Sequence, residues 1–204
     1  MIKPSAAASH PDEQPGSRRR EILEIAAQLF ARKGYRGTSM RDIGEQAGVL
    51  GGSLYHHIKS KDALFVELHN AALDEAAAKI ARAVDARTDP WARLEAACAA
   101  MLETQLAPDS LTVPLMNDFR EVSDPVRVQL LARRDRFEEL FRAIVDALPL
   151  PAKIDRSIYR NLLLSQLNAA PEWYRAGRLT PAEIAEQIVA IFRHDRRLDP
   201  NAQS

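Results

Sequence analysis

The stretch TSMRDIGEQAGVLGGSLYHHIKSKDAL, residues 38–64, predicts two short helices joined by a tight turn. Ser39 is a favourable N-cap residue, and Asp42 three positions later can complete a capping box. Gly48 can end this helix, and a second short helix is predicted over 51–58. Two short helices with a glycine in their connection, braced by a longer helix before them, form a helix-turn-helix arrangement.

The rest of the chain has helical rather than strand periodicity, so the predicted fold class is all-α. Asp-Pro pairs at 89–90 and 124–125 each place an N-cap before a proline at the first helical position, and TPAE at 180–183 is a full capping box. Pro114 and Pro171 are expected to bend or interrupt their helices. The predicted helices, about nine in number, cover 18–33, 39–48, 51–58, 60–86 and 155–176, lie around 110–121, and begin at 89, 124 and 180.

The distribution of charge is more informative than its total, because 28 basic residues balance 28 acidic ones. Residues 1–61 hold ten Lys and Arg against six Asp and Glu, a balance of +4. Residues 62–204 hold eighteen against twenty-two, a balance of −4. A basic front and an acidic remainder predict that only the front meets a polyanion.

Composition divides the chain into three predicted regions: a disordered tail over 1–17, a helix-turn-helix domain over 18–64 and a helical region over 65–204. Cys98 is the single cysteine, so no intrachain disulfide can form. No apolar run approaches the roughly 20 residues of a membrane span, and no secretory signal precedes the first helix. We therefore expect a cytoplasmic protein.

Five short motifs recur in order within residues 20–65. They are AQLF at 27–30, KGY at 33–35, TSMRDIG at 38–44, AGV at 47–49 and SLYHHIKSKDAL at 53–64. In this order they resemble the N-terminal domain of the TetR family of transcriptional regulators. The resemblance implies an all-helical homodimer that binds double-stranded DNA at a palindromic operator. It also implies a ligand-binding C-terminal region whose last two helices pair into a four-helix dimer interface.

Carried over position by position, the resemblance makes Arg41 a reader of base edges and gives nearby hydroxyl and ammonium groups to the phosphates. His56 stands where an aromatic residue is commonest in the family. The candidate DNA-binding residues are Ser39, Arg41, Leu50, Gly51, Gly52, Ser53, Tyr55, His56 and Lys61. Further positive charge is expected from Arg18, Arg19, Arg20, Arg36 and Lys59.

The two adjacent glycines suggest an unusual reading surface. Gly51 and Gly52 permit close approach to DNA but carry no donor or acceptor side chain. Leu50 offers only an apolar surface for a thymine methyl group. Our hypothesis is that direct readout by the helix at 51–58 is limited, so that Arg41 and DNA shape carry more of the specificity. The alternative is that the glycines only ease a tight turn.

The C-terminal region is predicted to bind a small-molecule effector and a second copy of the chain. The stretch from Trp173 to Gln187 is similar to family members that sense acyl-CoA or fatty acids. The candidate effector-binding residues are Met101, Met116, Phe119, Phe137, Phe141, Asn168 and Trp173, for which ordinary core packing is the alternative. The candidate dimer residues are Leu163, Leu167, Ile184, Ile188 and Ile191.

No catalytic site, metal site or cofactor is predicted. His56 and His57 are adjacent, so on a helix they point about 100° apart and cannot act as paired ligands. Cys98 lies among small apolar residues and is expected to be a buried hydrophobe. Two other functions remain as alternatives: a non-specific DNA binder, and an enzyme with a helical DNA-binding domain attached. The resemblance favours repression relieved by an effector, with activation as its alternative.

Overall fold

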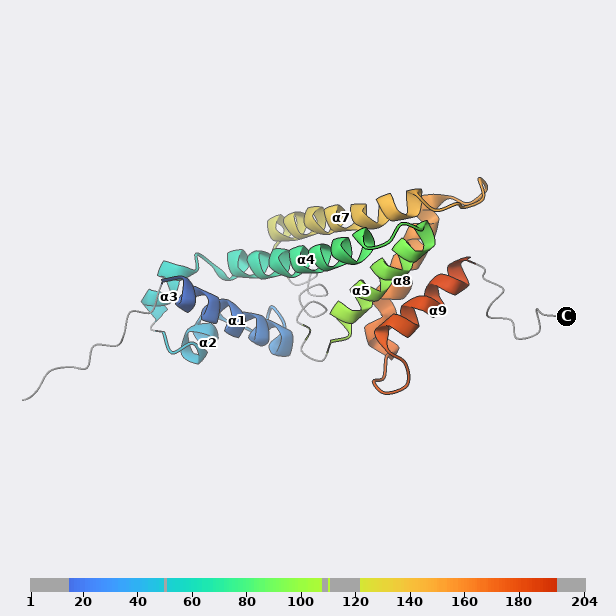
Figure 1. The fold of residues 1–204 in the computed structure, drawn as a ribbon. Helices are drawn as coiled ribbons and strands as arrows, with labels where there is room; N and C mark the ends of the chain where they lie inside the picture. The colour runs from blue at the N-terminus through green and yellow to red at the C-terminus, as the bar shows by residue number, and fades with distance from the viewer. Residues whose placement is uncertain (1–14, 50, 108–109, 111–121, 194–204) are drawn as a thin grey trace, which may run out of the picture.

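The computed structural model describes residues 15–49, 51–107, 110 and 122–193. Within these residues the chain forms eight helices and no strand, which confirms the all-α fold class (Figure 1). The helices are α1 (Pro15–Lys33), α2 (Met40–Gln46), α3 (Gly51–His57), α4 (Lys61–Asp85), α5 (Pro90–Gln105), α7 (Asp124–Asp146), α8 (Arg156–Trp173) and α9 (Pro181–Arg193). The helix expected around 110–121, with Pro114, lies outside the described residues. No helix in the described part of the chain is both long and apolar enough to cross a membrane.

Side-chain caps fix several helix starts as the sequence predicts. At α2, Ser39 Oγ accepts the backbone N–H of Asp42 at 3.1 Å, while Asp42 Oδ2 accepts that of Ser39 at 2.8 Å. Thr180 and Glu183 make the same reciprocal pair before α9, at 3.2 and 2.7 Å. Asp89 accepts a backbone N–H of α5 at 2.8 Å. These bonds satisfy donors that the first helical turn leaves unpaired.

Three helix boundaries differ from the prediction. Helix α1 begins at Pro15, inside the segment assigned to the disordered tail. Asp124, predicted to be an N-cap, is the first residue of α7, and Ser123 is the N-cap without a side-chain bond. Pro171 lies in the last turn of α8, which ends at Trp173, so its missing N–H removes a bond only where the helix is about to end.

Two hydrophobic cores lie along α4. The first joins α1, α2 and α3, which we call the head, to the start of α4. The second joins the end of α4 to α5, α7, α8 and α9, which we call the body. Figure 1 shows the head at one end of the molecule, with α4 and α7 running side by side towards the body.

Helix α4 contributes to both cores, one at each end. Leu64 and Phe65 are fully buried in the head core, whereas Ile80 is buried in the body core. The ring of Phe65 meets Phe30 and Tyr35 edge-on, with centroid distances of 5.2 and 5.0 Å. One continuous helix, α4, is therefore packed in both the head and the body and fixes their relative positions.

The start of α7 also belongs to the head core. Val122, Val126 and Leu130 are buried in the cluster that includes Phe30 and Phe65. These residues lie far beyond residue 64, where the sequence placed the end of the helix-turn-helix domain. The head is therefore packed against two helices rather than attached through one.

Replacing Leu130 with Ala is expected to destabilise the protein strongly, because its side chain is fully buried where α7 meets the head. Loss of a buried leucine side chain costs about 2–5 kcal/mol in the free energy of unfolding. Urea unfolding followed by circular dichroism measures this change. Leu131→Ala is the matched control, because the neighbouring side chain is 39% exposed. Equal losses in the two variants would contradict the packing described.

Candidate nucleic-acid interface

The turn between α2 and α3 depends on two glycines. Gly44 is buried, and a Cβ there would lie 3.3 Å from the Val49 carbonyl oxygen and 3.5 Å from Leu54. Gly48 has φ of 64°, a left-handed conformation that glycine adopts without strain. The backbone N–H of Val49 donates to the Gly44 carbonyl at 2.9 Å and closes the turn. These contacts set α3 at a fixed position against α2.

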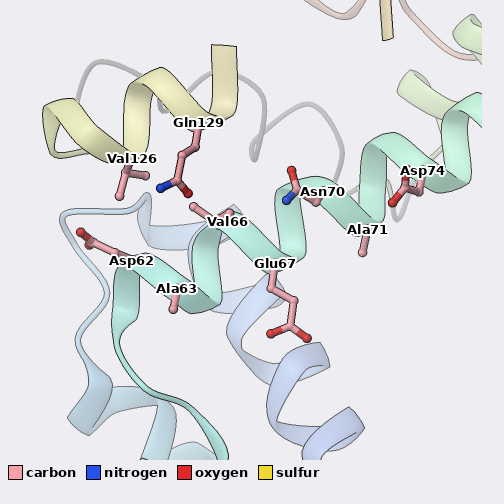
Figure 2. A pocket seen from close by; sticks show the side chains of 9 residues that line it. All are labelled: Asp62, Ala63, Val66, Glu67, Asn70, Ala71, Asp74, Val126 and Gln129. Carbon is pink, nitrogen blue, oxygen red and sulfur yellow. The ribbon is translucent and has the colours of Figure 1, made fainter. Parts of the chain in front are cut away.

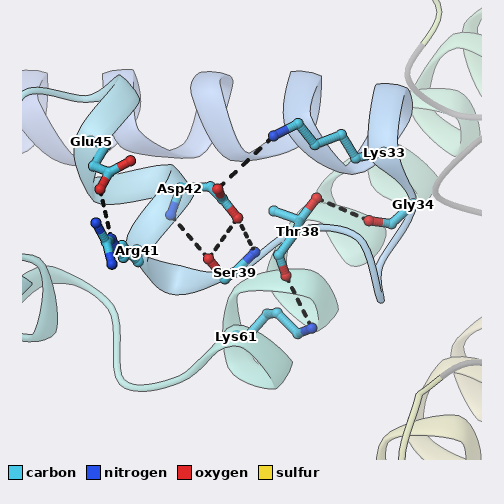
Figure 3. Close-up of polar contacts among 8 residues, drawn as sticks. All are labelled: Lys33, Gly34, Thr38, Ser39, Arg41, Asp42, Glu45 and Lys61. Atoms are coloured by element: carbon cyan, nitrogen blue, oxygen red, sulfur yellow. Dashed lines mark hydrogen bonds and ion pairs between the residues drawn. The ribbon is translucent and has the colours of Figure 1, made fainter.

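The entrance to α2 is fixed by the cluster of polar contacts in Figure 3. Asp42 Oδ2 accepts both the hydroxyl and the backbone N–H of Ser39, at 2.6 and 2.8 Å. These bonds, the side-chain bond first, lower the pKa of Asp42 below the usual carboxyl range. Lys33 Nζ lies 4.0 Å from Asp42 Oδ1 and ties α1 to the same point. Ser39, predicted to contact DNA, is exposed but acts here as the N-cap.

Arg41 extends from α2 into solvent, with 87% of its side chain exposed. Its Nε donates to Glu45 Oε1 at 2.7 Å, one helical turn further along. The hydrogen bond to Glu45, and then its charge, raise the pKa of Arg41. Among the described residues this is the only hydrogen-bond partner of the guanidinium, so both terminal nitrogens are available to another molecule.

The described part of α3 presents an open face beside Arg41. Ser53 and His56 are exposed, and Tyr55 is 57% exposed. A Cβ built on Gly52 would meet nothing within 4 Å, which leaves room for close approach. Leu54 points the other way into the head core. Gly51 is the first residue of α3, and Leu50 lies outside the described residues.

A recess of about 350 Å³ separates α2 from α3 on this face. Its lining residues are Met40, Arg41, Gly44, Glu45, Val49, Leu54 and Tyr55. Sequence reasoning missed Glu45, although its i, i+4 spacing from Arg41 is a recognisable signal for a helical ion pair. The two charged side chains therefore stand at a hollow on the surface, next to the exposed side chains of α3.

Several of the predicted phosphate contacts are engaged within the chain. Lys61 Nζ donates to the carbonyls of Tyr35 and Thr38 at 2.9 and 3.1 Å, and lies 4.0 Å from the Tyr35 ring centroid. Arg19 makes two bonds of 2.7 Å to Glu67 of α4, and Arg18 donates to the carbonyl of Ala47. These cations mainly hold the head together. Of the cations that the sequence predicts to face DNA, the exposed ones are Arg20, Arg36, Arg41 and Lys59.

A groove of about 700 Å³ lies between α4 and α7 beside the head (Figure 2). Its walls include three carboxylates, and each already has a partner. Asp62 accepts the hydroxyls of Tyr35 and Ser123, Glu67 pairs with Arg19, and Asp74 pairs with Arg133. None of the effector candidates within the described residues lines this groove. Because these carboxylates are already paired, the groove links the head to the body and is not an open cation site.

The described effector candidates are not gathered in one place. Met101 and Phe141 are buried in the body core, and Phe137 packs against it with its ring centroid 6.4 Å from that of Phe141. Asn168 is exposed and accepts a hydrogen bond from Gln105 at 3.0 Å. Trp173 is 51% exposed. Met116 and Phe119 lie outside the described residues.

Three of the predicted dimer residues face their own chain. Leu163, Leu167 and Ile184 are buried in the body core, so their apolar stripe packs inside the protomer. Ile188 is half-buried, and Ile191 is 61% exposed. Ile158 and Leu162 of α8 are also apolar, with exposures of 61% and 54%. The sequence did not distinguish them from Leu163 and Leu167, because both pairs are spaced four residues apart.

The remaining candidate chemistry is structural. Cys98 is fully buried in the body core, and burial raises the pKa of its thiol. Within the described residues no three His, Cys, Asp or Glu side chains are grouped so that they could hold a metal ion. Cys98 is thus the buried hydrophobe that its sequence context predicts.

Comparison with known proteins assigns both parts of the chain. The profile described as "Bacterial regulatory proteins, tetR family" matches residues 22–68, and "Tetracyclin repressor-like, C-terminal domain" matches residues 87–195. The HTH-type transcriptional repressor KstR2 of Rhodococcus jostii (strain RHA1) is 32% identical over 180 residues, covering 85% of this chain and 88% of that protein. KstR2 of Mycobacterium tuberculosis (strain H37Rv) is 31% identical over 186 residues, with coverages of 87% and 92%.

Solved structures agree with these matches. The ketosteroid transcriptional regulator KstR2 of Mycobacterium tuberculosis superposes with a TM-score of 0.70 at 30% identity, covering 88% of this chain and 94% of that one. AibR in complex with isovaleryl coenzyme A and operator DNA gives 0.73 at 24% identity, with coverages of 85% and 97%. At that identity the second likeness concerns the fold.

Removing the Asp42 carboxylate is expected to weaken the acid sensitivity of the fold. A carboxylate whose pKa is lowered by folding stabilises the protein above its unfolded pKa, about 4, and loses this effect as the pH falls through the folded value. Between neutral pH and a pH below about 4, the wild type should therefore lose more stability to unfolding than Asp42→Asn loses. Urea midpoints at neutral and acidic pH measure the difference. Glu24→Gln, which removes an exposed carboxylate of α1, is the control. Identical acid profiles for wild type and Asp42→Asn would contradict this role.

Proposed function

Because the chain is a transcriptional regulator of the TetR family, we propose that it represses by binding a palindromic operator as a homodimer and is released by a small-molecule effector. The observation that carries this proposal is the exposed face of α2 and α3, where Arg41, Ser53 and Tyr55 lie on a head fixed by its own core. Because its proposed target is operator DNA, we infer that the protein is cytoplasmic.

Recognition of DNA divides between a reader and several positioning groups. Arg41 carries two unoccupied terminal nitrogens, which suit the O6 and N7 acceptors of guanine. Ser53, Tyr55 and His56 offer exposed polar groups to the phosphates. Lys61, with two of its three N–H groups bonded inside the head, supports the surface more than it contacts DNA. Readout by α3 is limited because Gly51 and Gly52 have no side chain to offer.

The most direct test is selection of duplexes from a random pool by the full-length protein. A specific repressor should enrich a palindrome, and Arg41→Ala should lose about tenfold or more in preference for that palindrome over a scrambled duplex at matched salt. Circular dichroism should remain unchanged, because Arg41 is exposed. Equal affinity of the wild type for all duplexes would instead support a non-specific DNA binder.

We place the dimer contact on the exposed side of α8 and α9. Ile158 and Leu162 lie one turn apart on α8, and Ile191 lies on α9; all three are more than half exposed. Apolar side chains gathered on a surface mark an interaction site more often than an isolated one does. A two-fold pair of this kind must hold its heads about 34–36 Å apart, or a multiple of that, to occupy successive major grooves.

Introducing Asp at both Leu162 and Ile191 is expected to convert the dimer to monomers, because two carboxylates would be buried without partners. Light scattering at matched concentrations measures the mass. Val128→Asp is the control, since Val128 is 66% exposed on α7. A double variant that keeps the dimeric mass would place the contact elsewhere.

The effector is proposed to be a small hydrophobic molecule or an acyl-CoA whose apolar part binds in the body. The relative from Mycobacterium tuberculosis is a ketosteroid regulator, and the AibR structure contains isovaleryl coenzyme A. An acyl-CoA or fatty acid would suit the apolar side chains of Met101, Phe137 and Phe141, and would enter by parting α5 from α7. The groove between α4 and α7 is a poorer site for the anionic end, because Asp62, Glu67 and Asp74 line it.

A further inference from the structure

We propose that Glu45 sets the specificity of the DNA-reading surface by holding Arg41 in the orientation that reads one base pair. The proposal rests on the proposed function and adds a positioning residue to it. Glu45 makes no contact with a base in this role. Glu45 acts through the guanidinium of Arg41, from which it accepts the Nε hydrogen bond.

The geometry of the pair leaves the reading edge of Arg41 free. Glu45 Oε1 accepts the Nε–H at 2.7 Å, and Figure 3 shows this contact between the two side chains. Guanidinium has five N–H donors, of which four are on the two terminal nitrogens. Those nitrogens form the planar fork that can bond O6 and N7 of guanine at once. A contact through the two inner N–H groups of the terminal nitrogens would have blocked that fork.

Helix α2, which carries Arg41 and Glu45, is held firmly in place. Helix α2 is anchored by the Ser39–Asp42 capping box at its start and by the close approach of Gly44 to Val49. Arginine side chains otherwise lose substantial rotamer freedom when they bind. Because Glu45 already limits that freedom, less remains to be lost when DNA binds. This advantage applies only to the base pair that lies in line with the fork.

The negative charge of Glu45 also raises specificity, by a second mechanism. Its side chain is 62% exposed at the rim of the recess between α2 and α3. A carboxylate on a DNA-facing surface repels phosphates wherever the duplex lies, and so weakens binding to unrelated sequences. An exposed ion pair contributes little to folding stability, so the fold gives no strong reason for this acid. Glu45 thus supports the correct site and opposes incorrect ones.

The test uses the full-length protein and the duplex that wild type enriches from a random pool. Each base pair of one half-site is varied, and affinities are measured by fluorescence anisotropy at matched salt. Glu45→Ala should lose about fivefold to tenfold in discrimination at the base pair whose identity Arg41→Ala also ceases to read, and little elsewhere. It should also bind an unrelated duplex more tightly than wild type. Glu45→Gln keeps an acceptor for Nε, so it should retain most of the discrimination while showing the same gain for unrelated DNA.

The Arg134–Glu138 pair on α7 provides the control, because it has the same i, i+4 spacing with an Nε contact of 3.3 Å outside the head. Glu138→Ala should leave both readouts unchanged. In Arg41→Ala, adding Glu45→Ala should cause no further loss at the shared base pair. The proposal is overturned if Glu45→Ala keeps full discrimination at that pair while Arg41→Ala loses it. If wild type enriches no sequence, the proposed function itself fails, which is a different result.

Discussion

The contact between the first turns of α7 and the head is the constraint on which the rest of the arrangement depends. Val126 and Leu130 enter the same core as Phe65 of α4, and Ser123 donates a hydrogen bond to Asp62 beside it. A single connecting helix would leave the head free to tilt on its last turn. Two helices packed side by side have few alternative arrangements, because close-packed interiors deform in discrete steps. A shift at the start of α7 must therefore be accompanied by a movement of the head.

The parts of the fold that the sequence predicts well are those governed by local rules. The capping boxes at Ser39 and Thr180 need only residues three positions apart, and both form as expected. The turn between α2 and α3 similarly follows from Gly48 and its neighbours. The packing of Leu130 on the head was not predictable in this way. It joins residues far apart in sequence, and a helical stripe does not state which surface covers it.

The same limit applies at the candidate sites. Leu163 and Leu167 were predicted at the dimer contact because the family resemblance places that contact on the last two helices. Within the protomer both side chains face the body core, while Leu162 faces outwards. The family resemblance made Lys61 a candidate phosphate contact, but its ammonium group donates hydrogen bonds to the carbonyl oxygens of Tyr35 and Thr38, between α1 and α2. The Arg41 side chain is exposed, because it lies on a short polar helix and its contact is with Glu45, which is itself exposed. Periodicity and charge indicate which residues could bind a partner. The fold of the chain decides which of those side chains stay exposed and unbonded, and so can contact another molecule.

The burial of Cys98 has a practical consequence for observing this regulator at work. The chain holds one cysteine, and it lies wholly inside the body core. A thiolate that solvent can reach attacks a maleimide dye or spin label, so the buried natural sulfur stays unlabelled while the protein is folded. A second cysteine placed on the surface of α1 would then carry the only probe on each protomer. The separation of the two subunits could be followed by spectroscopy without first replacing a native residue.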